Sequence, residues 1–483
     1  MPSYIASLFS FYWVPSISTT LVYMLQATEY QPGPFIRWFW RTNDFSAVMQ
    51  RRQLDPTKAA RFIRLFTLLG MLAQLAIGGL LMYAGLVEYM TSGIFFGLAV
   101  LLLYPILWAH LLALLIWGGH LTVLRSRERN QAAEATALFA AHAGLKVAIV
   151  GSYGKTSMKE LLLTVLDEAK TVAATPANMN VLSSHVAFAR KLTGAEDIVL
   201  VEFGEGKPGD VARFSSVVQP TYAVITGLAP AHLDQYRTLK AAGRDIFSVA
   251  DTVEADRVYV NADSAAVRDF LRPDFRIYSR STVLGWRIVD AATSLSGTTF
   301  VLVKGKKRLS LRSHLIGLHQ VGPLAFAAAF ALFLGVPEKK VQAGVAKTKP
   351  YEHRMQPYQL GGAWVIDDTY NGNLEGIKAG TELLGSLKAK RKIYVTPGLV
   401  DQGKETAAIH KQVGHYIAAA EPNMVVLMQN SACQHIQDGL REARYKGTVR
   451  IEKNPILFYQ NLQSFVAKGD VVLMQNDWTD NYS

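Results

Sequence analysis

Two long apolar segments dominate the first quarter of the chain. One runs from Leu65 to Val87 and the other from Ile94 to Gly118, which is 23 and 25 residues without Asp, Glu, Lys or Arg. At about 1.5 Å per residue, each is long enough to cross the roughly 30 Å hydrocarbon core of a bilayer as a helix. The pattern therefore predicts two membrane-spanning helices joined by the short segment 88–93.

The charges around these segments predict their orientation. The connecting segment 88–93 contains no Lys or Arg, and the basic residues lie on the outer sides, at Arg51, Arg52, Lys58, Arg61, Arg64, Arg125, Arg127 and Arg129. By the positive-inside rule, both ends of the hairpin are cytoplasmic. We therefore expect a multi-pass protein of the plasma or inner membrane, in contact with membrane lipid, whose remaining domains face the cytoplasm.

A third apolar segment, residues 4–25, is interrupted by Pro15, so the predicted number of spans is two or three. No Lys or Arg precedes Arg37, which argues against a cleaved secretory signal and favours an anchor whose N-terminus lies outside. Segment 34–41 mixes aromatic and arginine side chains, as a chain in the lipid headgroup layer does, and a plain loop fits it equally well. Residues 1–130 are thus the predicted membrane anchor.

From about Gln131, short strands alternate with helices, which predicts a mostly parallel α/β sheet covered on both faces. Residues 280–313 predict a β meander. The expected central domain covers residues 131–347, and a second alternating set forms a Rossmann-like domain over residues 348–483. The predicted strands are 147–150, 198–202, 222–226, 257–260, 364–367, 392–396, 424–428, 449–451 and 470–474, and the predicted helices are 181–192, 208–218, 264–271, 321–334, 374–387, 405–420, 432–443 and 455–466.

Composition excludes several classes of protein. The single cysteine, Cys433, rules out an internal disulfide framework and a Cys-cluster zinc site. The net charge of +12 could indicate a nucleic-acid partner, but the basic residues are dispersed and no nucleic-acid-binding motif accompanies them. Residues 1–130 hold ten Lys or Arg against five Asp or Glu, so part of the excess charge belongs to the membrane region. We expect no nucleic-acid partner.

The stretch 147–157 has the order of a nucleotide-phosphate cradle: an apolar strand, a glycine turn, a lysine and two hydroxyl residues. Glycines in the turn allow backbone N–H groups to approach phosphate oxygens, and the following helix presents the positive end of its dipole. Lys155 can reach the β- and γ-phosphates, and the Thr156 hydroxyl can bind Mg²⁺. The sequence therefore predicts a site for ATP and Mg²⁺, made by Gly151, Ser152, Gly154, Lys155, Thr156 and Ser157.

Two further polar residues follow predicted strands, on the side where an open parallel sheet presents its ligand crevice. Glu202 ends the strand 198–202, and His232 lies shortly after the strand 222–226. A carboxylate can hold the Mg²⁺ that bridges the phosphates. Imidazole is an unusual ligand for Mg²⁺, and His232 taken alone is more often a hydrogen-bonded loop residue. Together with Thr156, these two residues are the candidate metal ligands.

Seven motifs follow one another in the second part of the chain. They are Gly151–Ser157, Ala174–Asn180, Val201–Gly204 with Pro208–Asp210, Ala223–Asp234, Asn261–Asp263, Leu315–His319 and Ile366–Asn373. Together they resemble the Mur ligase family, most closely the type that joins D-alanyl-D-alanine to UDP-N-acetylmuramoyl-tripeptide. The resemblance covers residues 145–483 and implies a P-loop ATPase domain, a C-terminal domain, and an ATP-dependent, ADP-forming amide ligase of peptidoglycan synthesis.

The resemblance implies a reaction in two steps. The γ-phosphoryl group of ATP passes to a carboxylate of a muramyl peptide, and an amine of an amino acid or of D-alanyl-D-alanine then attacks the acyl phosphate. Lys155, Glu202 and His232 would offset the charge that develops, with Mg²⁺ and a second metal ion near His232. Asn178 would lie near that second metal ion or the acyl substrate.

The resemblance also implies a nucleotide contact from the C-terminal domain. Asp368 would accept hydrogen bonds from the ribose, and closure of the domains about a hinge at 347–350 would exclude water. Taken alone, the run 367–371 is a turn whose side chains bond to local backbone groups. The pair 319–320 is either a helix-capping pair or part of an adenine pocket. The additional nucleotide-binding candidates are His319, Gln320, Asp368, Asn371 and Asn373.

The chain departs from the family pattern in several places. Gly243 stands where many Mur ligases have a carbamylated lysine, and the nearest lysine is Lys240. Gln320 and Pro323 replace an adenine-side asparagine pair, and residues 473–482 lack the usual lysine-glycine-serine run. The predicted membrane segments take the place of the family's uridine-nucleotide-binding domain, so the carboxylate substrate is expected to be either soluble or lipid-linked.

Three functions remain in competition after these observations. The first is a membrane-anchored peptide ligase of cell-wall synthesis. The second is a catalytically weakened, membrane-anchored scaffold or regulator that binds ATP, which Gly243 and Pro323 favour slightly. The third, a transporter with an attached ATPase, is poorly supported because the predicted spans contain no Asp, Glu, Lys or Arg that could line a substrate path.

Overall fold

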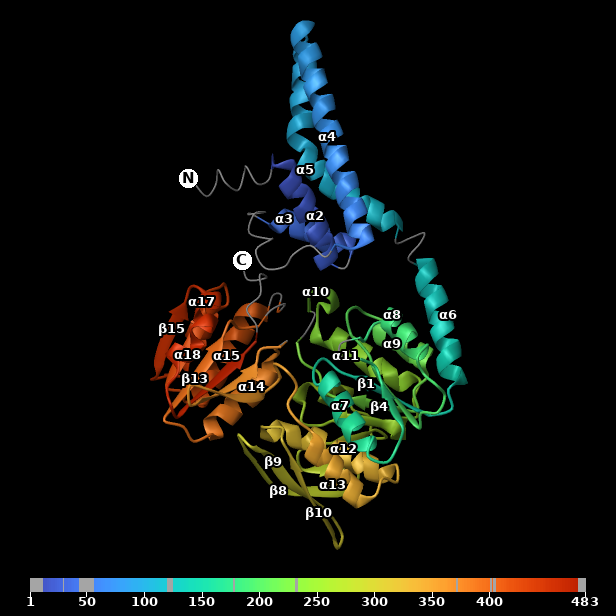
Figure 1. Ribbon diagram of the computed structural model, residues 1–483, viewed down its shortest axis with the longest axis vertical. Coiled ribbons are helices and arrows are strands. Elements are labelled where there is room, and N and C mark those ends of the chain that lie inside the picture. Colours follow the sequence, from blue (N-terminus) through green and yellow to red (C-terminus); the bar gives the residue numbers. More distant parts are fainter. Residues whose placement is uncertain are drawn as a thin grey trace. The chain divides into compact units, whose positions relative to one another are not determined.

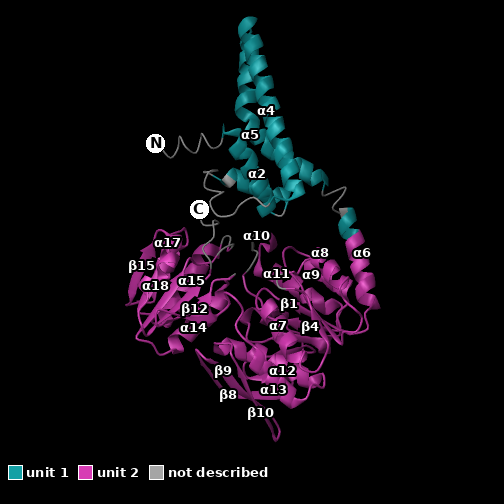
Figure 2. Ribbon diagram, viewed as in Figure 1, with its two compact units in different colours: residues 1–129 teal, residues 130–483 magenta. Residues whose placement is uncertain are grey.

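A computed structural model describes residues 12–28, 30–42, 56–119, 125–176, 179–230, 233–370, 372–399, 402 and 405–476. The chain forms two compact units, Met1–Arg129 and Asn130–Ser483, which are coloured separately in Figure 2. The expected division of the second unit near residue 347 stays a prediction.

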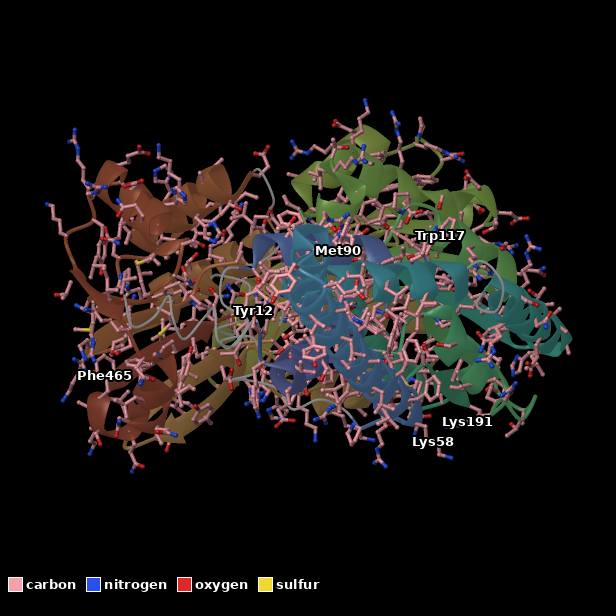
Figure 3. All side chains as sticks on the ribbon, turned by 90° about the horizontal axis from the view of Figure 1, so that it is seen from above. Tyr12, Lys58, Met90, Trp117, Lys191 and Phe465 are labelled. Carbon is pink, nitrogen blue, oxygen red and sulfur yellow. The ribbon has the colours of Figure 1, made fainter. Side chains whose placement is uncertain are left out.

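The first unit is built around a long helical hairpin (Figure 1). Its helices match the two predicted apolar segments and are long and apolar enough to cross a membrane by length and composition. Many of their large apolar side chains face outward, such as Leu80, which is 68% exposed, and Phe95, which is 73% exposed. Figure 3 looks onto this hairpin from above and labels Met90 at its turn. The helices of the unit are α2 (Val14–Ala27), α3 (Pro32–Arg41), α4 (Lys58–Val87) and α5 (Thr91–Gly119).

Glycines allow the two hairpin helices to approach closely. A Cβ atom on Gly97 would lie 2.6 Å from the backbone nitrogen of Met82 and 2.7 Å from the carbonyl oxygen of Gly78. A Cβ atom on Gly85 would lie 2.8 Å from the carbonyl carbon of Gly93. Since real Cβ atoms do not approach backbone so closely, these positions require glycine at this helix spacing.

Helices α2 and α3 pack against the hairpin through one apolar cluster that includes Ile17, Leu21, Phe35, Phe39, Met71, Trp108 and Leu112. Segment 34–41 is therefore helical, and its interpretation as a plain loop is wrong. The described part of the third apolar segment is the 14-residue helix α2, and residues 4–11 of that segment lie outside the described residues. Helix α6 (Arg125–Ala141), which the sequence analysis did not predict, follows the hairpin.

The second unit contains a ten-stranded sheet in the order β10-β9-β8-β7-β6-β5-β4-β1-β3-β2. Strands β1 to β6 pair in parallel, and β7 to β10 continue the sheet as an antiparallel meander, as predicted for residues 280–313. The strands are β1 (Leu145–Val150), β2 (Val172–Ala174), β3 (Ile198–Glu202), β4 (Tyr222–Ile225), β5 (Val258–Asn261), β6 (Arg276–Tyr278), β7 (Thr282–Val283), β8 (Trp286–Ser294), β9 (Gly297–Lys304) and β10 (Lys307–Ser313).

Helices cover both faces of this sheet because successive side chains of the central strands, which point to opposite faces, are apolar. In β1, Val147 and Ile149 join the core on one face, and Ala148 and Val150 join the core on the other. One face packs against α7 (Lys155–Leu166), α12 (Val321–Phe333) and α13 (Glu338–Lys347), and the other packs against α6, α8 (Leu182–Ala189), α9 (Asp210–Val218) and α11 (Leu239–Phe247). The predicted helix 264–271 is instead the 3₁₀ helix η5 (Ala265–Phe270).

A second sheet has six strands in the order β11-β12-β16-β13-β14-β15, all parallel except the edge strand β11. The predicted helix 455–466 is two short helices that meet at Asn461. The strands are β11 (Gln356–Leu360), β12 (Ala363–Asp368), β13 (Arg391–Thr396), β14 (Met424–Met428), β15 (Thr448–Glu452) and β16 (Asp470–Gln475), and the helices are α14 (Leu374–Ser386), α15 (Thr406–Ala419), α16 (Cys433–Glu442), α17 (Pro455–Gln460) and α18 (Leu462–Phe465).

Candidate nucleotide site

The glycine turn between β1 and α7 has a conformation that only glycine adopts easily. Gly151 has φ 145° and Gly154 has φ 72°, both in the left-handed half of conformational space. The turn is tied to the end of β4, because the Ser152 N–H donates to the carbonyl oxygen of Gly227 at 2.9 Å and the Thr226 hydroxyl donates to that of Tyr153. It opens directly onto the first turn of α7, whose backbone N–H groups are available to an anion.

Lys155, the first residue of α7, already has partners. Its Nζ atom lies 2.6 Å from the carbonyl oxygen of Gly151 and 2.6 Å from Oε2 of Glu205. The Lys155 side chain is 11% exposed and that of Glu205 is 4% exposed, so this ion pair is largely buried. Glu205 follows β3 by three residues and was not predicted from the sequence.

Thr156 and Glu202 come together as the strand order predicts. The Thr156 hydroxyl donates to Oε1 of Glu202 at 3.1 Å, because β3 ends beside the start of α7. Lys159, one turn further along α7, is fully buried, and its Nζ lies 3.4 Å from Oε2 of Glu202 and 3.5 Å from a carboxylate oxygen of Glu160. Lys159 was not predicted from the sequence, although its spacing of four residues from Lys155 places it on the same helix face.

Backbone and side-chain contacts hold Glu202 in place. Its N–H donates to the Thr175 hydroxyl at 3.1 Å, and Nδ2 of Asn180 lies 3.4 Å from its Oε1. His185 donates from Nε2 to its carbonyl oxygen at 2.9 Å, and burial lowers the pKa of this histidine to about 4, which keeps the ring neutral. Within the described residues, Oε2 of Glu202 accepts no hydrogen bond.

This oxygen set is suitable for Mg²⁺. The Thr156 hydroxyl and the Glu202 carboxylate are hard oxygen donors, and a buried carboxylate oxygen that accepts no hydrogen bond favours a cation. Three of the predicted site residues, Asn178, His232 and Asn371, lie outside the described residues. Where the structure is described, no three His, Cys, Asp or Glu side chains converge as a metal site.

Asp368 lies at the carboxyl end of β12, in the second sheet. Its Oδ1 accepts from the Met355 N–H at 3.1 Å and its Oδ2 accepts from Nε2 of Gln475 at 2.8 Å. Burial raises its pKa to about 7. The local-turn interpretation of this run holds for Asp367, whose Oδ1 accepts from the Thr369 N–H and hydroxyl, but not for Asp368.

The other candidates toward the C-terminus have local partners. Asn373 caps α14, since its Oδ1 accepts from the Gly376 N–H at 2.9 Å. The side chains of His319 and Gln320 bond to each other, with Nε2 of Gln320 donating to Nε2 of His319 at 2.9 Å. The Gln320 side chain does not cap α12, so the capping interpretation of the pair is wrong. Burial lowers the pKa of His319 to about 4.

Two parts of the chain match known protein families. Residues 149–331 match the Mur ligase middle domain, and residues 353–475 match the domain described as Mur ligase, glutamate ligase domain. The chain belongs to the Mur ligase family. Both matches lie in the second unit, and together they include both sheets except for residues 145–148 of β1.

Several Mur ligases that join D-alanyl-D-alanine to UDP-N-acetylmuramoyl-tripeptide are similar in sequence. The Escherichia coli K12 enzyme is 29% identical over 290 residues, which are 57% of the chain and 62% of that enzyme. The Mycobacterium leprae enzyme is 25% identical over 364 residues, which are 68% of the chain and 70% of that enzyme. The chain spans about three fifths of the length of the first relatives that it matches.

Solved structures of Mur ligases share the fold of this chain. MurF from Acinetobacter baumannii has a TM-score of 0.64 at 19% identity, covering 72% of the chain and 77% of that structure. MurF from Thermotoga maritima in complex with ADP has a TM-score of 0.64 at 20% identity, covering 72% and 80%.

One departure from the Mur ligase pattern has a clear structural basis. A Cβ atom on Gly243 would overlap the ring of Phe270, so the position cannot carry a lysine without moving that ring. Lys240, the nearest lysine, is exposed on α11.

Proposed function

We propose that this chain is an ATP-dependent, ADP-forming amide ligase of peptidoglycan-precursor synthesis. It activates a muramyl-peptide carboxylate as an acyl phosphate and joins it to an amino acid or D-alanyl-D-alanine. The observation that carries the proposal is the convergence of Lys155, Thr156 and Glu202 at the carboxyl ends of β1 and β3. The names of the relatives and the ADP in a structural neighbour support the same class of reaction.

The residues of this site suit phosphoryl transfer to a carboxylate. The backbone N–H groups of the glycine turn and α7 orient the phosphates, and Lys155 offsets their negative charge. Thr156 and Glu202 would hold Mg²⁺, which supplies positive charge for the transferring phosphoryl group. Asp368 is proposed to accept hydrogen bonds from the ribose, and His319 with Gln320 to border the adenine. Asn178, His232, Asn371 and Asn373 remain proposed contributors, on the resemblance alone.

The first unit is proposed to anchor the enzyme in the plasma or inner membrane, with the ligase domains in the cytoplasm. Helices α4 and α5 carry exposed apolar side chains along their length, and aromatic residues, Tyr89 at the turn and Trp117 near the other end, are placed as in an interfacial belt. Such an anchor confines the enzyme to the surface where a lipid-linked carboxylate substrate would be found. The substrate is proposed to be either this lipid-linked form or a soluble one.

An ADP-release assay tests the proposed function. The detergent-purified chain is supplied with ATP and Mg²⁺, a panel of soluble and lipid-linked muramyl peptides, and a panel of amino acids and D-amino-acid dipeptides. We expect ADP only when an acid and an amine are both present, and none from the Lys155→Ala variant. ADP formation at the same rate with and without the acid and the amine would contradict the proposal. Equal rates with soluble UDP-linked tripeptide and lipid-linked substrates would exclude a dedicated lipid-linked substrate.

A second candidate function is an ATP-binding scaffold without turnover. The packing of Gly243 against Phe270 favours it, because this position leaves no space for a carbamylated lysine. A scaffold would bind ADP under the same conditions and release none from ATP with any pair of substrates.

A further inference from the structure

Lys155, which follows the glycine turn, already has two partners in this structure. Two of the three donor positions of the Lys155 ammonium are directed to Gly151 and to Glu205, each at 2.6 Å. The contact with Glu205 joins opposite charges, so it is the stronger of the two. A nucleotide phosphate that binds Lys155 therefore meets a carboxylate already in place.

The burial of Glu205 makes the loss of its contact with Lys155 unfavourable. Its side chain is 4% exposed, and Lys155 is its ion-pair partner among the residues that the structure describes. A phosphate that takes over Lys155 brings further negative charge next to the carboxylate and leaves it without its cation. Like charges at such distances repel strongly in a partly buried site.

Glu205 differs in this respect from the other acid of the site. Glu202 is bonded to the Thr156 hydroxyl and lies 3.4 Å from the buried ammonium of Lys159, so its charge stays compensated when Lys155 turns to a phosphate. Removing Glu205 thus affects Lys155 without disturbing the candidate Mg²⁺ oxygens.

We propose that Glu205 competes with the nucleotide phosphates for Lys155, so that this carboxylate sets the affinity of the site for nucleotides. This inference rests on the proposed function, since it takes the glycine turn as the phosphate site. The competition involves only phosphates that reach Lys155, which are the β- and γ-phosphates in such a turn. It therefore applies to ADP and ATP but not to AMP.

Isothermal titration of the full-length, detergent-purified protein tests the inference. ADP and AMP are titrated in EDTA, so that no divalent cation can neutralise Glu205, into the wild type, Glu205→Gln and Glu205→Ala. The control is Glu254→Gln, which removes an acid that is 67% exposed and pairs with Arg257 on the surface. We expect ADP to bind both Glu205 variants about tenfold or more tightly than the wild type. AMP should bind the Glu205 variants as it binds the wild type, and Glu254→Gln should bind ADP as the wild type does.

Unchanged or weaker ADP binding by Glu205→Gln, with its melting temperature retained, would overturn the inference. An equal gain for AMP would do the same, because the effect would then not depend on the phosphates at Lys155. A parallel titration of the wild type with ADP and Mg²⁺ separates this failure from a failure of the proposed function. If the wild type binds ADP with Mg²⁺, only the role of Glu205 is wrong; if it does not, the nucleotide site itself is wrong.

Discussion

At the residue scale, the candidate site depends on charges that compensate each other in a confined space. Lys159 is fully buried beside Glu202 and Glu160, and Lys155 is paired with Glu205. Buried charges are tolerated only when they are paired, so each of these side chains constrains the others. Ion pairs therefore fix these side chains before a nucleotide binds, and Lys155 has to exchange Glu205 for a phosphate.

Replacing Lys159 by Met should destabilise the second unit. The substitution leaves the Glu202 carboxylate without its buried cation, and breaking a buried pair from one side costs about 3–5 kcal/mol. We expect a clear fall in the melting temperature of the protein without nucleotide or Mg²⁺. Lys191→Met, at an exposed position, is the matched control. Equal melting temperatures for the two variants would show that the pair contributes nothing.

Asp368 should make nucleotide affinity depend on pH. Burial raises its pKa from 3.8 to about 7, so the group is mostly neutral below this value and mostly ionised above it. An ionised carboxylate accepts hydrogen bonds from hydroxyls more strongly than a neutral carboxyl group does. If Asp368 binds the ribose, ADP affinity falls as the pH is lowered through the pKa of this group. Titration calorimetry should show this fall in the wild type and a flatter profile in Asp368→Asn; identical profiles would remove Asp368 from the ribose site.

At the element scale, the packing of helices and strands explains which parts could be predicted from the sequence. Strand β3, which pairs with β1 and with the edge strand β2, begins and ends at its predicted residues because both of its faces are buried and its apolar run is uninterrupted. The edge strands β2 and β11 were not predicted from the sequence, because β2 has only three residues and β11 contains Pro357. Short helices were predicted poorly for a related reason, because few residues carry their apolar pattern. The single helix predicted over 455–466 is two short helices that meet at Asn461.

The candidate site could be predicted from the sequence only in part. Because ligand-binding residues gather at the carboxyl ends of parallel strands, the sequence alone predicts that Thr156 and Glu202 lie together, and their hydrogen bond confirms it. The partners Lys159 and Glu205 were missed, because the contact of Lys159 with Glu202 joins α7 to the end of β3 and that of Glu205 with Lys155 joins the segment after β3 to α7. Such tertiary contacts leave no local sequence pattern.

The hairpin of α4 and α5 should tolerate a large side chain at one glycine and not at another. A side chain on Gly97 would meet the backbone of α4 at Met82 and Gly78, whereas a Cβ atom on Gly79 would meet nothing within 4 Å among the described residues. We expect Gly97→Leu to lower the temperature at which the detergent-solubilised protein aggregates, measured by size-exclusion chromatography after heating. Gly79→Leu should behave as the wild type. Equal behaviour of the two variants would contradict the observed helix spacing.

At the scale of the whole molecule, the membrane proposal fixes which parts of the chain are accessible from each side. In a Cys433→Ala background, a cysteine at Met90 should react with a membrane-impermeant maleimide added to intact cells, since the turn is proposed to lie outside. A cysteine at Lys191 should react only after permeabilisation. Figure 3 labels both Met90 and Lys191. Labelling of both positions, or of neither, in intact cells would contradict this topology.

The transfer of oxygen from the carboxylate to phosphate tests the central claim most directly. The chain is supplied with ATP, Mg²⁺, an amine and a muramyl peptide whose reacting carboxyl group carries ¹⁸O. An acyl-phosphate route leaves one of these oxygens on the released phosphate, because the amine expels the phosphate together with it. We predict inorganic phosphate with one ¹⁸O atom for each amide bond formed. Phosphate without ¹⁸O, formed alongside the amide, would contradict carboxyl activation at the site of Lys155, Thr156 and Glu202.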